Sequence, residues 1–177
     1  MRIISGSRKG HGIAAPRGIA TRPTSDRVRE AAFNLIGPVD DATVLDLFAG
    51  SGAMGLEALS RGARRCVFVE SSQEAVRVIQ ANLLKLGLNG AVIDKRDALA
   101  FLRGARARAT TYDLVVCDPP YGNWGSLEAD LAELVPPVLA VGGVLAVETG
   151  ARTEPRLPLD LVTTRRYGSA RISVFTR

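Results

Sequence analysis

Residues that bind metal ions or form disulfides are scarce in this sequence. It contains two cysteines, Cys66 and Cys117, and a single histidine, His11. The cysteines lie far apart, and a zinc site needs about four closely spaced ligands, so the sequence predicts no metal site. Each cysteine lies in an apolar run, which indicates a buried, reduced thiol.

Long apolar runs are absent as well. No run approaches the roughly 20 residues that a membrane-spanning helix needs. Residues 1–6 hold too few apolar side chains for a secretory signal. The 177 residues suffice for one domain with a hydrophobic core. We therefore expect a cytoplasmic protein with no membrane partner.

Lysine is rare, and arginine carries most of the positive charge. The lysines are Lys9, Lys85 and Lys95, yet the net charge is +5. The arginines gather in residues 1–30 and 152–177. Such clusters favour a polyanion as partner, because phosphate contacts supply most of the sequence-independent affinity for nucleic acid. A generally basic surface would explain the charge equally well.

Two parts of the chain differ in their pattern. Residues 1–42 are rich in Gly, Pro, Ser, Thr and Arg. We expect a short hairpin between residues 2–4 and 12–14, then a helix that begins near Asp26 and is stopped by Gly37-Pro38. From residue 43 onward, apolar strands alternate with amphipathic helices. Residues 1–42 should therefore form a basic extension, and residues 43–177 an α/β domain.

The alternation predicts a parallel sheet covered on both faces. We expect strands at 44–48, 66–70, 91–93, 113–118 and 143–149, and helices at 53–61, 73–86, 98–103 and 127–139. Residues 159–167 and 170–175 are joined too tightly for a parallel crossover, so they should form an antiparallel hairpin. A mostly parallel sheet that ends in such a hairpin is the architecture of the Rossmann-like class I methyltransferases.

A glycine-rich loop follows the first of these strands. Gly50, Gly52 and Gly55 match G-x-G-x-x-G, which fits an NAD-dependent enzyme and a methyltransferase alike. Asp46 favours the methyltransferase, because a carboxylate would repel a pyrophosphate but suits the cationic methionine part of S-adenosylmethionine. The order D-x-F-x-G-x-G resembles methyltransferase motif I. The predicted cofactor loop is Phe48, Ala49, Gly50, Ser51 and Gly52.

Two more carboxylates follow the next two strands. Glu70 ends the second strand, where a carboxylate accepts hydrogen bonds from ribose hydroxyls. Asp97, followed by Ala98, comes after the third strand, where methyltransferases place an acid against the adenine amino group. Asp97 is also a good helix N-cap residue. These residues are predicted to complete the cofactor site.

The tetrapeptide Asp118-Pro119-Pro120-Tyr121 follows a strand that should lie beside the first, at the carboxyl edge of the sheet. A planar amino group is a poor nucleophile. Acceptors for both of its hydrogens encourage the nitrogen to pyramidalise toward the methyl group. Asp118 and the Pro119 carbonyl can be those acceptors, because the prolines fix the backbone, and Tyr121 can stack on the target. The tetrapeptide therefore predicts methylation of a planar nitrogen.

On these motifs the chain resembles the RsmD-type family, the guanine-N2 methyltransferases of bacterial small-subunit ribosomal RNA. The resemblance rests on residues 2–6 (R-I-I-S-G), 8–10 (R-K-G) and 21–30 (T-R-P-T-S-D-R-V-R-E), with the D-L-F-A-G-S-G loop and D-P-P-Y. It implies a seven-stranded sheet and, as target, a guanine near the P site of the small subunit. It also implies that residues 21–30 fold over the cofactor, with Thr24 in contact with it.

The small size of the chain favours a target that a larger particle presents. Outside the catalytic core the chain has only residues 1–42 and short loops, so specificity could come from an assembled ribosomal subunit. Arg8, Lys9, Arg17 and Arg22 would then contact phosphates, or else form a mobile, solvated arm. Because the particle would supply the large surface, we expect a monomer.

The motifs also suit other functions. D-P-P-Y fits an N6-adenine or a glutamine-amide methyltransferase, although the basic ends favour nucleic acid. An NAD-dependent oxidoreductase would leave Asp46 and D-P-P-Y unexplained. A non-catalytic RNA-binding assembly factor would keep the fold, but the presence of Asp46 and Asp118 argues against it.

Overall fold

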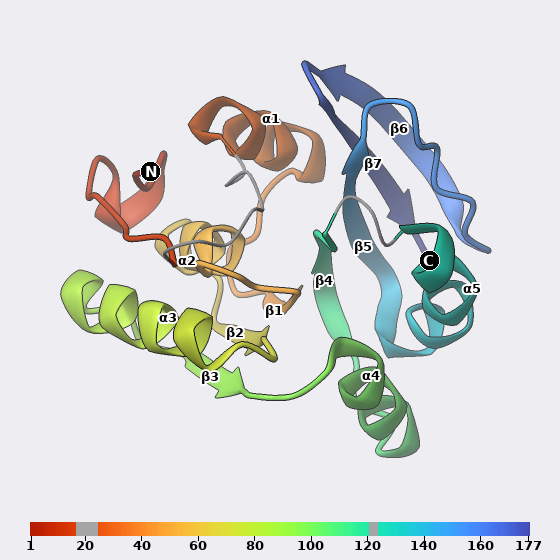
Figure 1. Ribbon diagram of the computed structural model, residues 1–177, viewed down its shortest axis with the longest axis horizontal. Coiled ribbons are helices and arrows are strands. Elements are labelled where there is room, and N and C mark those ends of the chain that lie inside the picture. The colour runs from red at the N-terminus through yellow and green to blue at the C-terminus, as the bar shows by residue number, and fades with distance from the viewer. Residues whose placement is uncertain (17–24, 121–123) are drawn as a thin grey trace.

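The chain forms a seven-stranded sheet in the order β3-β2-β1-β4-β5-β7-β6 (Figure 1). The computed structural model describes residues 1–16, 25–120 and 124–177. The parallel strands are β1 (Thr43–Leu47), β2 (Arg65–Val69), β3 (Ala91–Asp94), β4 (Tyr112–Cys117) and β5 (Leu139–Gly150). β7 (Ala170–Thr176) pairs antiparallel with both β5 and β6 (Asp160–Tyr167). The predicted parallel sheet with a terminal antiparallel hairpin is confirmed.

Helices cover both faces of the sheet. Helices α1 (Asp26–Ile36), α2 (Ala53–Ser60) and α3 (Gln73–Leu86) share one hydrophobic core, and α4 (Ala98–Ala107) and α5 (Trp124–Leu134) share the other. Alternate strand residues supply the two cores, as the period of a strand requires. In β1, Val44 belongs to the first core and Leu45 to the second. Among the described residues, no helix has the length and apolar character of a membrane span.

Short polar residues and glycines set the helix ends. Ser25 caps α1, because its hydroxyl accepts a hydrogen bond from Val28 N at 3.3 Å. Ser72 caps α3 in the same way, through Ala75 N at 3.3 Å. α3 ends at Leu86, and its C-cap Gly87 has a φ of 57°, in the left-handed region that suits glycine. The predicted start near Asp26 and the predicted span of α3 are confirmed.

Three predicted elements have different bounds in the structure: the helices predicted at 98–103 and 127–139 and the strand predicted at 143–149. α4 continues to Ala107, past the predicted end at residue 103. α5 begins at Trp124 and ends at Leu134, because the two prolines that follow lack N–H donors, and Pro136–Val138 forms a 3-10 turn. β5 begins at Leu139 instead of residue 143, and an irregularity in its pairing with β4 absorbs the extra length.

The predicted N-terminal hairpin is reduced to a single bridge between Arg2 and Gly12. The connection contains the 3-10 turn Gly6–Arg8. The N–H groups of Ile4 and Ser5 donate to the Glu57 carboxylate of α2, at 2.8 and 2.9 Å. Because α2 takes these donors, the segment lies against the helices instead of extending a second strand.

Gly55 lets α2 approach β2 closely. A Cβ atom at this position would lie 2.3 Å from Cε1 of Phe68 and 2.6 Å from Sγ of Cys66, both of which are buried side chains of β2. The third glycine of the loop motif is therefore required for packing between helix and strand.

Gly55→Ala is expected to lower the free energy of unfolding by about 2 kcal/mol, because the added methyl group overpacks β2. Gly125→Ala in α5 is the matched control, since no atom of the described residues outside its own helix backbone and chain neighbours lies within 4 Å of its Cβ position. There the gain in helix propensity, up to about 1 kcal/mol, should prevail. Urea denaturation measures both variants, and equal stabilities would contradict the packing argument.

Candidate cofactor and catalytic site

Three strands end together at one edge of the sheet. In the parallel register, Leu47 of β1 lies opposite Val69 of β2 and Cys117 of β4. The residues that follow these strand ends, Phe48, Glu70 and Asp118, therefore meet at the same edge. The carboxyl edge of an open α/β sheet is where ligands bind. The structure thus brings the predicted cofactor loop beside the predicted catalytic tetrapeptide.

The cofactor loop makes a tight turn between β1 and α2. Phe48 and Gly50 have φ angles of 59° and 55°, and Gly52, the N-cap of α2, has a φ of 77°. The turn is closed by Gly52 N, which donates to Ala49 O at 2.7 Å. Among the described residues, a Cβ atom at Gly50 would meet only Phe48 O, at 3.9 Å. The loop therefore leaves open backbone at Gly50, which a cofactor can approach.

Glu70 joins this loop to the end of β2. One carboxylate oxygen accepts from Gly50 N at 2.8 Å, and the other accepts from Ser72 N at 2.7 Å. A carboxylate has about four lone-pair sites, so each oxygen keeps capacity for one more donor. The half-buried Glu70 can therefore hold the loop and also accept two ribose hydroxyls.

Asp46 lies beneath the loop and is only 2% exposed. Its carboxylate accepts from Gly55 N, in the first turn of α2, at 2.9 Å. Burial raises the pKa of Asp46 to about 7; the Gly55 hydrogen bond opposes this rise and the charge of Glu70 adds to it. Asp46 therefore holds α2 under the loop, and its contact with the methionine part of the cofactor stays a prediction.

Asp97 is the N-cap of α4, as its residue type predicted. Its side chain accepts from Ala100 N at 2.9 Å, and it is exposed next to the buried Ala98. The contact of Asp97 with adenine stays a prediction.

Asp118 and Pro119 lie directly after β4. Asp118 is half-buried, Pro119 is buried and Pro120 is exposed. The preceding Cys117 is a buried, free thiol, as predicted, and so is Cys66. Burial, and then the charges of Asp118 and Asp46, raise the pKa of Cys117. Tyr121 lies outside the described residues, so its stacking role stays a prediction.

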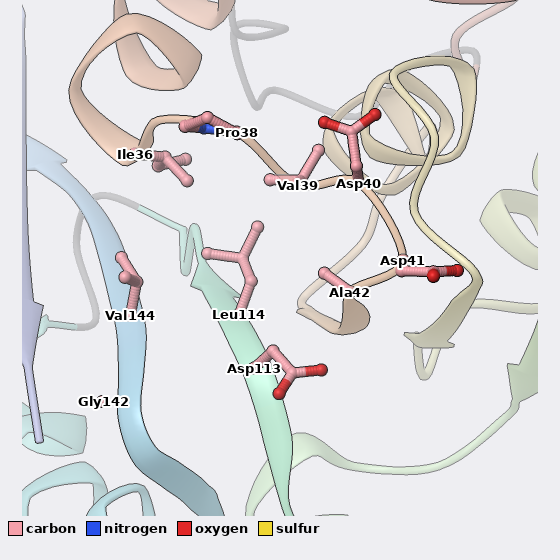
Figure 2. Close-up of a pocket in the computed structure, with 10 residues that line it drawn as sticks. All are labelled: Ile36, Pro38, Val39, Asp40, Asp41, Ala42, Asp113, Leu114, Gly142 and Val144. Carbon is pink, nitrogen blue, oxygen red and sulfur yellow. The ribbon is translucent and has the colours of Figure 1, made fainter.

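A pocket of about 420 Å³ lies at the opposite edge, where β4 and β5 begin (Figure 2). The residues that line it are Ile36, Pro38, Val39, Asp40, Asp41, Ala42, Asp113, Leu114, Gly142 and Val144. Asp113 in its wall accepts from Thr43 N and Oγ1, at 2.7 and 2.6 Å, and these bonds lower its pKa. Asp113 thus joins the starts of β1 and β4, far from the cofactor loop.

The family model with the description "Conserved hypothetical protein 95" matches residues 1–176. The chain belongs to this family. YlbH of Bacillus subtilis, provisionally named as an rRNA methyltransferase, is 40% identical, and the match covers 100% of this chain and 99% of YlbH. Ribosomal RNA small subunit methyltransferase D of Escherichia coli (strain K12) is 40% identical over 68% of this chain and 60% of that protein.

Solved structures agree with this membership of the Conserved hypothetical protein 95 family. A structure provisionally described as the methyltransferase yhhF of Escherichia coli has a TM-score of 0.87 at 33% identity, and covers 100% of this chain and 97% of that chain. A hypothetical protein of Thermus thermophilus has a TM-score of 0.86 at 31% identity, with 100% and 99% covered. The resemblance to RsmD-type methyltransferases, the Rossmann-like methyltransferase fold and S-adenosylmethionine as cofactor are confirmed.

The first 16 residues of this family member pack against the helices. The guanidinium of Arg8 donates to Leu86 O and, at 3.3 Å, to Gly87 O at the end of α3, where a cation is favoured. Arg8 is therefore half-buried and bound to the protein, whereas Lys9 is exposed. Residues 1–16 are not a solvated arm. Arg17, Arg22 and Thr24 lie outside the described residues, and their roles stay predictions.

The sequence pattern did not predict the burial of several polar side chains, among them Glu57, Arg29 and Asn82. Glu57 of α2 and Arg29 of α1 are both fully buried, with Arg29 Nε 3.6 Å from Glu57 Oε2. Asn82 of α3 is 2% exposed. Glu57 had a signal, because it is the one charged residue in the helix A-M-G-L-E-A-L-S. Arg29 and Asn82 lie in ordinary amphipathic helices, and nothing local marks them.

Asn82 connects the N-terminal segment to the cofactor loop. Its amide oxygen accepts from Ala14 N at 2.8 Å, and its Nδ2 donates to Ala14 O at 3.0 Å and to Ser51 O at 3.2 Å. Ser51 lies between two glycines of the loop. Asn82 is therefore expected to fix both the loop and the path of the chain that leads to residue 17.

Asp46→Asn should change how stability depends on pH. The folded pKa of about 7 exceeds the reference value of 3.8. The folded protein therefore binds the Asp46 proton more tightly, and this stabilisation is lost as pH rises from about 4 to about 7. Relative to Asp46→Asn, the wild type should lose roughly 2–3 kcal/mol between pH 5 and pH 8. Urea titrations at both pH values measure the difference, with Asp160→Asn as an exposed control. If wild type and Asp46→Asn differed by the same free energy of unfolding at both pH values, the raised pKa of Asp46 would be contradicted.

Asn82→Leu should weaken cofactor binding, because it leaves the carbonyls of Ala14 and Ser51 and the Ala14 N–H without their partner. We expect a loss of about 1–3 kcal/mol in stability and a rise of roughly tenfold in the Kd of S-adenosylhomocysteine. Titration calorimetry measures the Kd. Gln80→Leu, on the exposed side of the same helix, is the control. Unchanged affinity in a folded Asn82→Leu variant would leave Asn82 with a purely structural role.

Proposed function

We propose that this chain transfers the methyl group of S-adenosylmethionine to the exocyclic N2 of a guanine in small-subunit ribosomal RNA. The observation that carries this proposal is the meeting of the cofactor loop and the Asp118-Pro119 turn at one edge, on the adjacent strands β1 and β4. The name of the relative that is 40% identical over 68% of this chain gives the class of substrate. The guanine and its N2 atom rest on the resemblance to the RsmD-type family.

The geometry suits methyl transfer to a planar nitrogen. When bound, S-adenosylmethionine supplies a methyl group on a cationic sulfonium. Asp118 and the Pro119 carbonyl follow the buried end of β4, so both are held by a rigid strand. Two acceptors held there can take hydrogen bonds from the two hydrogens of an amino group and orient its nitrogen. Asp118 need not be a strong base, because the proton can leave during or after the transfer.

The charge of the chain supports a nucleic-acid substrate over a glutamine side chain. The net charge is +5, and Lys9 is an exposed cation on the N-terminal segment. Arg8 contributes less than the sequence suggested, because its guanidinium binds the end of α3. We further propose that a monomer acts in the cytoplasm on an assembled small subunit, which presents the guanine to this small enzyme.

Asp118→Ala tests the catalytic assignment. Loss of one of the two acceptors should reduce methyl transfer by roughly 100-fold or more, while the Kd of S-adenosylhomocysteine stays within a few-fold of wild type. Methyl-labelled S-adenosylmethionine, small subunits that lack the modification and single-turnover kinetics measure the rate. The matched control is Asp160→Ala, an exposed aspartate at the start of β6. Wild-type rates in Asp118→Ala would remove Asp118 from the reaction.

The identity of the product tests the substrate. Labelled small subunits, naked ribosomal RNA, duplex DNA and a protein extract are digested, and the methylated product is identified by mass. N2-methylguanosine from the subunit is the expected result. N6-methyladenine or methylglutamine would keep the mechanism and replace the substrate. Cofactor binding without any labelled product would indicate a non-catalytic assembly factor.

A further inference from the structure

The part of the catalytic edge beyond Asp118 is built by the last three strands. β5 lies next to β4, with Val147 opposite Cys117. Gly150 at the end of β5 and Tyr167 at the end of β6 both pair with Ala170, the first residue of β7. The loop after β5 and the turn between β6 and β7 therefore lie at the same edge as the end of β4 (Figure 1), which Asp118 follows directly.

Positively charged side chains are concentrated at this part of the edge. Arg152 follows β5, and Arg165 and Arg166 lie at the end of β6; all three are exposed. Arg171 at the start of β7 is buried and binds Glu154 Oε1 at 2.9 Å. Glu154 is thus neutralised by a buried partner, and the three exposed arginines dominate the charge. We call Arg152, Arg165 and Arg166 the basic rim.

Arg171 holds the backbone of the rim in place. Its Nε and one terminal nitrogen donate to Ala151 O at 3.3 and 3.2 Å, and its other terminal nitrogen donates to Thr164 Oγ1 at 3.1 Å. Ala151 N also donates to Ser169 O in the turn, at 2.9 Å. A buried guanidinium with these bonds joins the loop after β5 to both strands of the hairpin. The backbone that carries the rim is therefore fixed before any ligand arrives, which lowers the entropic cost of binding.

The rim arginines have no carboxylate partner within the part of the chain that the structure describes. The guanidinium of Arg165 donates to the neighbouring Thr164 O at 2.9 Å. Charges that protect an edge strand from pairing with another chain would be spread along the whole of β6. The rim arginines are not spread in this way. The other end of β6 instead exposes Leu161 by 54% and Val162 by 61%. Within β6, the cations are confined to the catalytic end.

We propose that the basic rim binds the phosphate backbone of the RNA beside the target nucleotide. This inference rests on the proposed RNA substrate and adds a surface distinct from the N-terminal segment. Strands lie about 4.8 Å apart, so β6 is three spacings, or roughly 14 Å, from β4. A nucleic-acid chain whose base reaches Asp118 passes over the rim within that span. Exposed arginines then bind phosphate oxygens and set the register of the strand.

The test compares two triple variants with equal loss of charge. The rim variant is Arg152→Ala, Arg165→Ala and Arg166→Ala. The control variant is Arg64→Ala, Arg65→Ala and Arg77→Ala, which removes exposed arginines at the start of β2 and on α3. Filter binding measures the Kd for ribosomal RNA and for small subunits as a function of salt, with S-adenosylhomocysteine present.

We expect the rim variant to bind RNA roughly tenfold or more weakly than wild type. The slope of log K against log salt should fall by about 2, since each phosphate contact contributes about 0.7–0.9. The KM for the RNA should rise, with little change in kcat at saturating RNA. The control variant should stay within about twofold. Substitution of the rim by three lysines should restore most of the slope, because the number of charges is restored.

Equal changes in RNA affinity in the rim and control variants, or no change in either, would overturn the proposed binding of RNA by the rim and leave the proposed function intact. Failure of the wild type to bind or methylate RNA would instead overturn both. Calorimetric binding of S-adenosylhomocysteine to each variant shows that it is folded. A change in kcat alone would reassign the rim to the catalytic step.

Discussion

The parallel pairing of β1 with both β2 and β4 is the constraint on which the site depends. Because the strands run in the same direction and in register, Leu47, Val69 and Cys117 lie side by side where the strands end. Neighbouring strands are about 4.8 Å apart. The predicted cofactor loop and the predicted catalytic turn are therefore separated by about one strand spacing, a distance suited to the proposed transfer of a methyl group between adjacent ligands.

Buried polar groups then hold the cofactor loop in one conformation. Gly50 N, Gly55 N and Ser51 O each bond to a side chain from elsewhere in the fold: Glu70, Asp46 and Asn82. A buried group that loses its partner costs about 1–3 kcal/mol, so these bonds offset the conformational freedom of a glycine-rich segment. Phe48 shows the result, because a non-glycine residue is kept at a φ of 59°. The site is shaped before the cofactor binds.

The sequence predicted the parts of this arrangement that local pattern controls. The alternation of strands and helices predicted the sheet. The positions of Asp46, Glu70 and Asp118 relative to the strands predicted that all three lie at one edge. What could not be predicted are the long-range partners of polar side chains. Asn82 bonds to Ala14, 68 residues away, and Glu57 bonds to Ile4, 53 residues away. No local periodicity encodes such pairs.

Arg8 is another residue whose partner within the fold could not be predicted from the sequence. A basic residue in a glycine-rich N-terminal segment is typical of a phosphate contact, yet its guanidinium binds the last carbonyls of α3. The free carbonyls at a helix end are a competing acceptor that becomes visible only once the segment is placed in the fold. The number of basic residues in a sequence therefore overstates the number of cations free to contact a partner, because some of them donate their hydrogen bonds within the protein.

The edge of the sheet is divided by charge between the cofactor and the RNA that we propose as its second ligand. Asp46 and Glu70 lie on the β1–β2 side, where a cationic cofactor is favoured, and the basic rim lies at the ends of β5 and β6. From β1 to β5 there are two strand spacings, about 10 Å, and from β2 to β6 there are five, about 24 Å. At physiological ionic strength the Debye length is about 8 Å, so the carboxylates repel an RNA strand on the rim only weakly. The order of the strands thus lets one edge attract a cation and a polyanion at the same time, with β4 and Asp118 between them.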